Sequence, residues 1–346
     1  MRFETAPAPH LKPIDSVAGV MRDVLLALVP AAFASVYFFG WGLLINVVIA
    51  SAVAFGCEAA ILSLRGKPLR PFLNDYSAIV TAVLLVFALP PVTPWWITAT
   101  GSFFAIVFAK HLYGGLGYNT FNPAMAGYAV LLIAWPAELS QWLPPRGLGL
   151  DLAELNIPQT LTVVFTGQLP QELSWDFVSA ATPLDTVKTG LAEMKMMSEI
   201  ESDPVFGRLG GVGWGWVNAG FLAGGIYLLA RGVIRWHIPV AMLTALFAIA
   251  SVFYMADSSS HATPTLHLFG GATLIGAFFI ATDPVSAATS VKGRLVYAAG
   301  IGLLVYAIRS WSSYPDGVAF AVLLMNMAVP LIDHFTKPRT YGHAQP

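Results

Sequence analysis

The sequence has few charged residues and a single cysteine. Only 11% of its 346 residues are Asp, Glu, Lys or Arg, whereas soluble domains carry about 25%. The one thiol, Cys57, cannot form an internal disulfide, and it cannot hold an iron–sulfur cluster without a partner chain. Because the formal net charge is −1, no basic surface for nucleic acid is indicated, and we expect no nucleic-acid partner.

The sequence does contain many long apolar runs, and 56% of its residues are hydrophobic. Ten runs approach the roughly 20 residues that a helix needs to cross a bilayer. They predict an all-α integral membrane protein with about ten transmembrane helices. The third and eighth are short, and we expect them to be tilted or broken. The predicted spans cover residues 21–39, 42–64, 76–91, 95–112, 122–142, 213–231, 236–256, 266–282, 294–310 and 316–334.

The basic residues orient these spans. An even number of spans places both termini on one side of the membrane. If that side is cytoplasmic, 13 of the 18 Lys and Arg residues fall on the inner side, including Arg65, Lys110 and Arg294. Cytoplasmic loops are normally enriched in Lys and Arg. The remaining five basic residues fall outside or near the outer face: Arg146, Lys188, Lys195, Arg208 and Arg309.

A long polar insertion divides the chain. We expect a cytoplasmic segment at 1–20, a first membrane half at 21–142, a periplasmic loop at 143–212, a second half at 213–334 and a cytoplasmic tail at 335–346. Because each half has five spans, the halves are inverted relative to each other, as in many transporters. Asn122-Pro-x-x-Ala126 is echoed by Asp283-Pro-x-x-Ala287, which is a weak indication of an internal repeat.

Two similar polar stretches fall on opposite sides of this layout. Asp176-Phe-Val-Ser179-Ala-Ala181-Thr182 lies in the exterior loop, and Asp283-Pro-Val-Ser286-Ala-Ala-Thr289 lies inside. Small residues and hydroxyls often mark close helix packing, and a lone threonine is a poor nucleophile. The alternative is that one threonine is a covalent attachment point, which requires an accessible hydroxyl flanked by small residues. Thr182 meets that requirement.

Three further polar positions have both a structural and a functional interpretation. Asn122 can cap the helix that begins at Pro123, or it can join Asn119 in binding the polar edge of a planar heterocycle. Asp283 can cap the next helix, or it can be a functional acid near the membrane interior. Glu58, in the second span, can belong to an ion path or pair with a neighbouring helix. The chain has no Walker-type phosphate-binding motif.

The stretch ending at Thr182 resembles the motif that receives covalent FMN in the NqrB/RnfD family. That motif often reads Ser-Gly-Ala-Thr, and this chain has Ala180 in place of the glycine. The resemblance, closest to the RnfD branch, covers essentially the whole chain. It implies that a flavin transferase outside the cytoplasm joins FMN through its phosphate to Thr182, with Asp176, Ser179 and Ala181 in the motif. An exterior transferase favours Thr182 over Thr289.

The same resemblance implies that Asn119, Asn122 and Asp283 line a non-covalent riboflavin site. The implied function is electron transfer in an ion-translocating NADH/ferredoxin oxidoreductase complex, the Rnf complex of the bacterial inner membrane, coupled to Na⁺ or H⁺ movement. The implied partners are other membrane and peripheral subunits and membrane lipid, and we expect no activity from the isolated chain.

Two functions of other classes remain open. A channel or secondary transporter for a small polar solute predicts flux through the single chain and no bound flavin. A structural anchor, whose exterior loop docks partners, predicts that Thr182, Asn119, Asn122 and Asp283 tolerate substitution.

Overall fold

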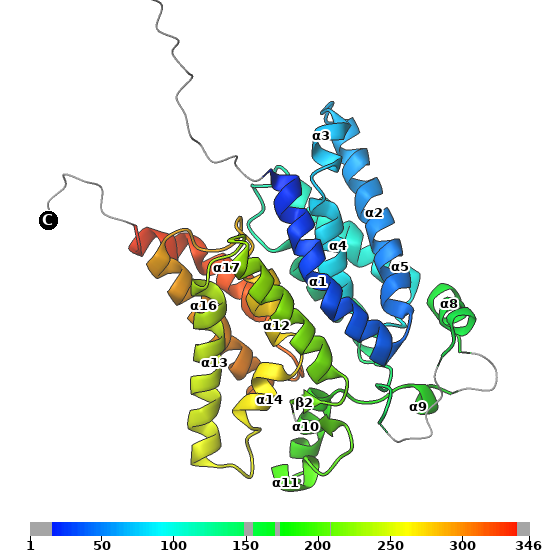
Figure 1. Ribbon diagram of the computed structural model, residues 1–346, viewed down its shortest axis with the longest axis vertical. Coiled ribbons are helices and arrows are strands. Elements are labelled where there is room, and N and C mark those ends of the chain that lie inside the picture. The colour runs from blue at the N-terminus through cyan, green and yellow to red at the C-terminus, as the bar shows by residue number, and fades with distance from the viewer. Residues whose placement is uncertain (1–15, 149–154, 170–173, 208, 338–346) are drawn as a thin grey trace, which may run out of the picture.

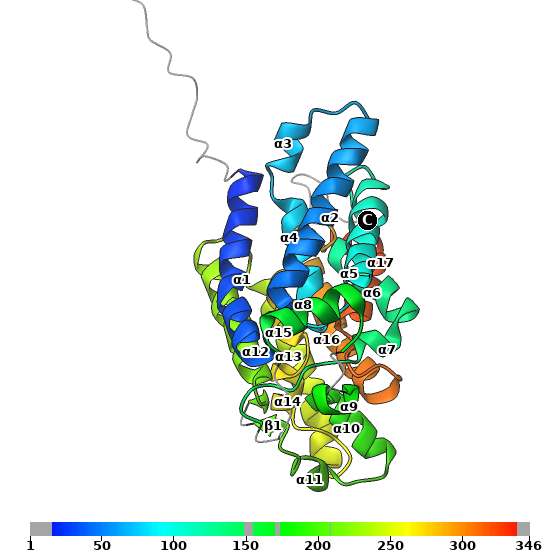
Figure 2. The same ribbon diagram turned by 90° about the vertical axis from the view of Figure 1, so that its right-hand side faces the viewer.

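The fold, seen in a computed structural model, is helical and is described for residues 16–148, 155–169, 174–207 and 209–337. The side chains of Asp176 and Phe177 lie outside that description. Two groups of helices stand side by side, one from the N-terminal part of the chain and one from the C-terminal part (Figure 1). Most helices of the segment between them lie at the end of the molecule opposite the beginning of the first helix (Figures 1 and 2).

The described residues before position 142 form the first group. Its elements are α1 (Val17–Phe39), α2 (Gly42–Leu64), α3 (Leu69–Leu73), α4 (Ser77–Phe87), α5 (Trp95–Phe103), the π-helical η1 (Phe104–His111), α6 (Pro123–Ala134) and α7 (Pro136–Leu139). The second group contains α12 (Trp214–Ala230), α13 (His237–Ala256), α14 (Pro264–Phe269), α15 (Thr273–Ile275), the π-helical η2 (Gly276–Ile280), α16 (Val291–Trp311) and α17 (Val318–Phe335).

The connecting segment is folded where it is described. It holds α8 (Ile157–Thr166), α9 (Trp175–Val178), α10 (Pro183–Ala192) and α11 (Met197–Ile200), followed by an antiparallel pair of short strands, β1 (Phe206–Gly207) and β2 (Gly210–Gly211). Val187 of α10 packs with Met197 and Ile200 of α11. These three side chains lie against Leu266 of α14 and Ala262, which precedes that helix. This part of the predicted exterior loop is therefore anchored to the second group.

Six helices of the described chain are long and apolar enough to cross a membrane. They are α1, α2, Leu69–Phe87 taken as one segment, α13, α16 and α17. Large apolar side chains at mid-helix positions are exposed, including Phe33 at 77% and Val48 at 68%, as suits a surface in contact with lipid. Helical segments lie in all ten predicted ranges, but the layout of ten spans in two inverted halves stays a prediction.

Two apolar segments are interrupted. One is Leu69–Phe87, whose break lies at the start of the third predicted span, and the other is the eighth predicted span, which is broken inside its predicted range. Between α3 and α4, Tyr76 takes a left-handed conformation with φ of 62°. Between α14 and α15, Gly271 does the same with φ of 57°. Because an interruption leaves backbone groups without helical partners, side chains from elsewhere must satisfy them. Each break is surrounded by buried polar residues, and each borders one of the two cavities described below.

The two groups meet most closely where α1 packs against α12. Gly220 and Gly224 of α12 face the backbone of α1 at Ala31 and Ala27, with no room for a side chain. Small residues allow this approach between membrane helices. The same pair of helices shares an ion pair, with an oxygen of Asp23 3.2 Å from a guanidinium nitrogen of Arg231.

Candidate functional site

Thr182 begins a helix. It is the N-cap of α10: its Oγ1 accepts a hydrogen bond from the backbone N–H of Asp185 at 3.2 Å and donates to the Asp185 carboxylate at 3.0 Å. Thr182 is half-buried and Ala181 is exposed. Burial raises the pKa of the Asp185 carboxyl. Ser179 donates its hydroxyl to the carbonyl of Trp175 at 2.8 Å, which orders the turn before Thr182.

The second Ser-Ala-Ala-Thr stretch lies at the N-terminal end of α16, whereas the helix that Thr182 begins contacts the C-terminal end of α16. Thr289 is exposed, donates its hydroxyl to Asp333 at 3.0 Å, and directly precedes α16, whose N-cap is Ser290. Lys188 of α10, by contrast, donates to the carbonyls of Arg309 and Tyr314 at the far end of α16, at 3.3 and 2.8 Å. Since a helix of 21 residues is about 30 Å long, the two threonines are well separated.

A cavity of about 500 Å³ opens beside Thr182. Helices from both groups line it, and its walls are mainly apolar and aromatic; they include Met125, Tyr128, Trp142, Trp214, Tyr314 and Asp316. The rings of Trp142 and Trp214 meet edge to face with centroids 4.7 Å apart. This volume lies within the range of about 300–1,000 Å³ typical of sites for organic ligands.

A smaller cavity of about 130 Å³ is lined by all three residues of the expected riboflavin site. Asn119 donates its amide to the carboxylate of Asp283 at 3.3 Å, and Ser286 donates its hydroxyl to the same carboxylate at 2.8 Å. The structure thus brings Asn119 and Asp283 together from segments 164 residues apart. The cavity's volume is below the usual range for a ligand of flavin size, so a flavin here requires side-chain movement or a partly external tail.

Asn122 is the N-cap of α6, as one of its two sequence interpretations predicted. Its Oδ1 accepts a hydrogen bond from the N–H of Met125 at 3.1 Å, and its Nδ2 donates to the carbonyl of Ile280 at 3.3 Å. Its own N–H donates to Asn326 at 3.1 Å. Asn122 therefore ties the two groups of helices together at the wall of the smaller cavity.

Glu58 pairs with a buried lysine that sequence reasoning had counted among the inner-loop cations. Lys110 Nζ lies 2.6 Å from Glu58 Oε1 and donates to the hydroxyl of Ser77 at 2.7 Å. His111 Nε2 lies 3.2 Å from the same carboxylate oxygen. Lys110 also lines the smaller cavity. Its signal in the sequence was its position, at the end of an otherwise apolar run from Phe103 to Ala109.

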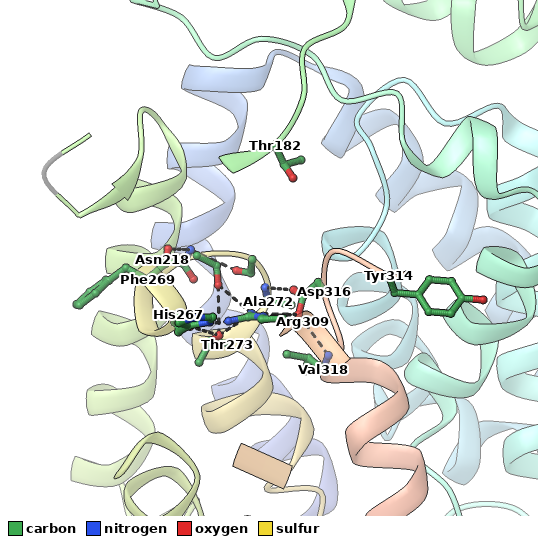
Figure 3. A network of polar contacts seen from close by, with 12 residues as sticks. Thr182, Asn218, His267, Phe269, Ala272, Thr273, Arg309, Tyr314, Asp316 and Val318 are labelled. Carbon is green, nitrogen blue, oxygen red and sulfur yellow. Dashed lines mark hydrogen bonds and ion pairs between the residues drawn. The ribbon is translucent and has the colours of Figure 1, made fainter. Parts of the chain in front are cut away.

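Arg309 is the second buried cation, although its place in the sequence suggested a charge near the outer face. Arg309 is only 7% exposed. Its guanidinium donates to the carbonyl of His267 at 2.7 Å and to the hydroxyl of Thr273 at 2.9 Å. It also pairs with Asp316 at 3.0 Å (Figure 3). Asp316 accepts a hydrogen bond from the N–H of Ala272 at 2.6 Å.

The helices long enough to cross a membrane, the interrupted segments and the two cavities between helix groups define a polytopic helical membrane protein with internal cavities. The described residues hold no cluster of His, Cys, Asp or Glu that suits a metal ion. The chain belongs to the NQR2, RnfD, RnfE family, whose sequence model matches residues 4–342. It is accordingly a multi-pass membrane protein.

Several relatives are similar over their full length, and all bear the same name, that of the D subunit of an ion-translocating oxidoreductase complex. The relative from Aliivibrio salmonicida is 51% identical, over 99% of each chain. The one from Vibrio atlanticus is 51% identical over 99% of this chain and 100% of its own length. That of Pectobacterium atrosepticum is 50% identical over 99% of each chain.

Proposed function

We propose that this chain is the membrane electron-transfer subunit of an ion-translocating NADH/ferredoxin oxidoreductase complex of the bacterial inner membrane. It carries covalent FMN on Thr182 and riboflavin near Asn119, Asn122 and Asp283, and electron flow drives Na⁺ or H⁺ across the membrane. Both termini are cytoplasmic and residues 143–212 are periplasmic. The names and full-length identity of the relatives support the complex and the presence of other Rnf subunits as partners.

The placement of Thr182 beside the larger cavity is the observation that carries the FMN proposal. A phosphate ester on Oγ1 replaces only the hydroxyl proton, so the oxygen can still accept the hydrogen bond from the N–H of Asp185. A phosphate there lies at the positive end of a ten-residue helix, which favours an anion. The Asp185 carboxylate, which accepts a hydrogen bond from the free hydroxyl, has to turn away because it would repel the phosphate.

The riboflavin proposal depends on the polar wall of the smaller cavity. The amide of Asn119 and the carboxylate of Asp283 provide donor and acceptor groups for the polar edge of a flavin ring. Lys110, paired with Glu58, lines the same wall. The flavins supply the redox chemistry when bound, and the residues of this chain position and tune them.

The decisive experiment compares two threonine variants in cells that also express the flavin transferase. Thr182→Val removes the proposed attachment oxygen, and Thr289→Val is the matched control in the second copy of the motif. We expect the denatured wild-type and Thr289→Val chains to show flavin fluorescence in a gel and the Thr182→Val chain to show none. Extraction of non-covalent flavin from the same samples checks the second site, where Asn119→Ala should lower riboflavin content and leave covalent FMN unchanged.

Two results contradict the proposal. Fluorescence that persists in Thr182→Val moves the attachment point elsewhere. A wild-type chain without any flavin, made beside an active transferase, favours the solute channel or transporter, for which solute flux through the single chain is the direct assay.

A further inference from the structure

Both interrupted segments are closed by a buried cation that comes from the end of a later helical segment. Lys110, in the last turn of η1, donates to the hydroxyl of Ser77 at 2.7 Å. Arg309, in the last turn of α16, donates to the hydroxyl of Thr273 at 2.9 Å. Ser77 and Thr273 are each the first residue of the helix that follows the break. At each break, a buried cationic side chain therefore hydrogen-bonds the first residue of the helix that follows.

The oxygens around Arg309 form one compact group (Figure 3). The Nη2 atom lies 3.2 Å from the carbonyl oxygen of Gly270, 2.9 Å from Thr273 Oγ1 and 3.0 Å from Asp316 Oδ1. The Nη1 atom donates to the carbonyl of His267 at 2.7 Å. Thr273 Oγ1 is itself 2.8 Å from that carbonyl oxygen and 3.2 Å from the carbonyl oxygen of Gly270. Two carbonyls, a hydroxyl and a carboxylate therefore surround a single cationic group.

The electrostatics of the break also favour a cation at this point. The carbonyls of His267 and Gly270 lie at the C-terminal end of α14, where the exposed carbonyl dipoles are negative, and Asp316 adds a formal charge. The other carbonyls of the break, those of Phe269 and Gly271, accept from the Asn218 amide at 2.7 and 3.3 Å. In transporters, unwound carbonyls at the end of a broken membrane helix coordinate Na⁺.

We propose that the four oxygens of His267, Gly270, Thr273 and Asp316 form a site for a monovalent metal ion, which this chain fills with its own Arg309 side chain. A guanidinium stays charged at every physiological pH and cannot leave. The break between α14 and α15 is therefore closed to transported ions, and any ion path through the protein bypasses it. This inference is independent of the flavins.

The test removes the built-in cation and offers metal ions in its place. We would measure thermal unfolding of the full-length Arg309→Ala chain in NaCl, KCl and choline chloride at equal ionic strength. We expect it to melt below wild type in choline, and its melting temperature to rise by about 3 °C or more in Na⁺ or K⁺. The wild-type chain should show no such rise. Adding Asp316→Asn to Arg309→Ala should abolish the effect, because it replaces a charged oxygen ligand with an amide.

Arg294→Ala is the matched control, since Arg294 lies on the same helix and donates to the carbonyl of Ala288 at 3.2 Å. It should show no rescue by metal ions. The proposal is overturned if Arg309→Ala responds equally to Na⁺, K⁺ and choline, or if methylguanidinium restores its stability and no metal ion does. It is also overturned if Arg309→Ala cannot be recovered even when purified in NaCl or KCl, while Arg309→Lys folds.

Discussion

At the scale of single residues, the buried pair of Glu58 and Lys110 bears on whether the Glu58 carboxylate pairs with a neighbouring helix or belongs to an ion path. Both residues are 2% exposed, and their charged atoms are 2.6 Å apart. Breaking such a pair by removing one partner leaves an uncompensated buried charge, whereas replacing both partners with neutral groups is often nearly neutral. The structure therefore supports the pairing interpretation of Glu58, and its role in an ion path stays a prediction.

We expect Glu58→Gln to lower the free energy of unfolding by about 3–5 kcal/mol, because Lys110 loses its counter-charge. The double variant Glu58→Gln/Lys110→Met should recover most of that loss. Thermal unfolding of the purified chain in detergent measures both effects. A Glu58→Gln chain as stable as wild type would mean that the pair contributes little.

The same double variant tests the ion path. If the assembled complex still moves ions with Glu58→Gln/Lys110→Met, the carboxylate serves only as the partner of Lys110. If stability returns while ion movement is lost, Glu58 belongs to the path.

Residue-level prediction from sequence succeeded where a local rule fixes the role and failed where the partner is distant. The cap at Asn122 follows from its position before Pro123 and is confirmed by its hydrogen bond to Met125. The environments of Lys110 and Arg309 depend on residues such as Glu58 and His267, which lie 52 and 42 positions away. The order of the spans places Lys110 on the inner side and Arg309 near the outer face, but it considers hydropathy along the chain and no packing between helices.

At the scale of elements, the contact between α1 and α12 depends on glycine. A Cβ at Gly224 would meet the carbonyl of Ala27, whereas a Cβ at Gly56 of α2 would meet nothing within 4 Å. The two positions are a matched pair, since each is a glycine inside a long apolar helix.

Gly224→Ala should destabilise the chain by about 1–3 kcal/mol, as overpacking does. Gly56→Ala should leave stability unchanged or raise it by up to about 1 kcal/mol, the gain in helix propensity. Melting temperatures of the two variants beside wild type provide the measurement. Equal melting temperatures for both variants would show that α1 and α12 can separate without cost.

The interruption in the eighth predicted span could be expected from its short apolar run, whereas the other break lies at the start of the third predicted span. The echo between Asn122-Pro123 and Asp283-Pro284 was a poorer guide to internal repetition. Asn122 caps α6, whereas Asp283 lies well before α16, whose N-cap is Ser290. Ser77 and Thr273 are better matched in structure, but their surrounding sequences share too little to be noticed.

At the scale of the whole molecule, the orientation of the chain in the membrane can be measured by labelling single introduced cysteines. Residue 67 precedes α3, and residue 194 lies between α10 and α11. The helix α3 and the pair α10 and α11 are at opposite ends of the molecule (Figures 1 and 2). Lys67 and Met194 are both exposed. Since Cys57 is the only native thiol, a Cys57→Ala chain provides a background without reactive sulfur.

In that background, we expect a membrane-impermeant thiol reagent to label Met194→Cys in intact spheroplasts and Lys67→Cys only after lysis. The reason is that the predicted layout places residue 194 outside and residue 67 inside. The reverse pattern would invert the orientation. Labelling of both from one side would contradict the number of spans between them.

Both cavities are shared between the two groups of helices. Each is lined by side chains from before residue 142 and from after residue 213, and Asn119, Asn122 and Asn326 bond across that boundary. Neither group of helices can form a complete site alone. Although the fold looks like two modules, a chain cut between them would contain no intact pocket until its fragments reassociated, and both pockets would then be restored together.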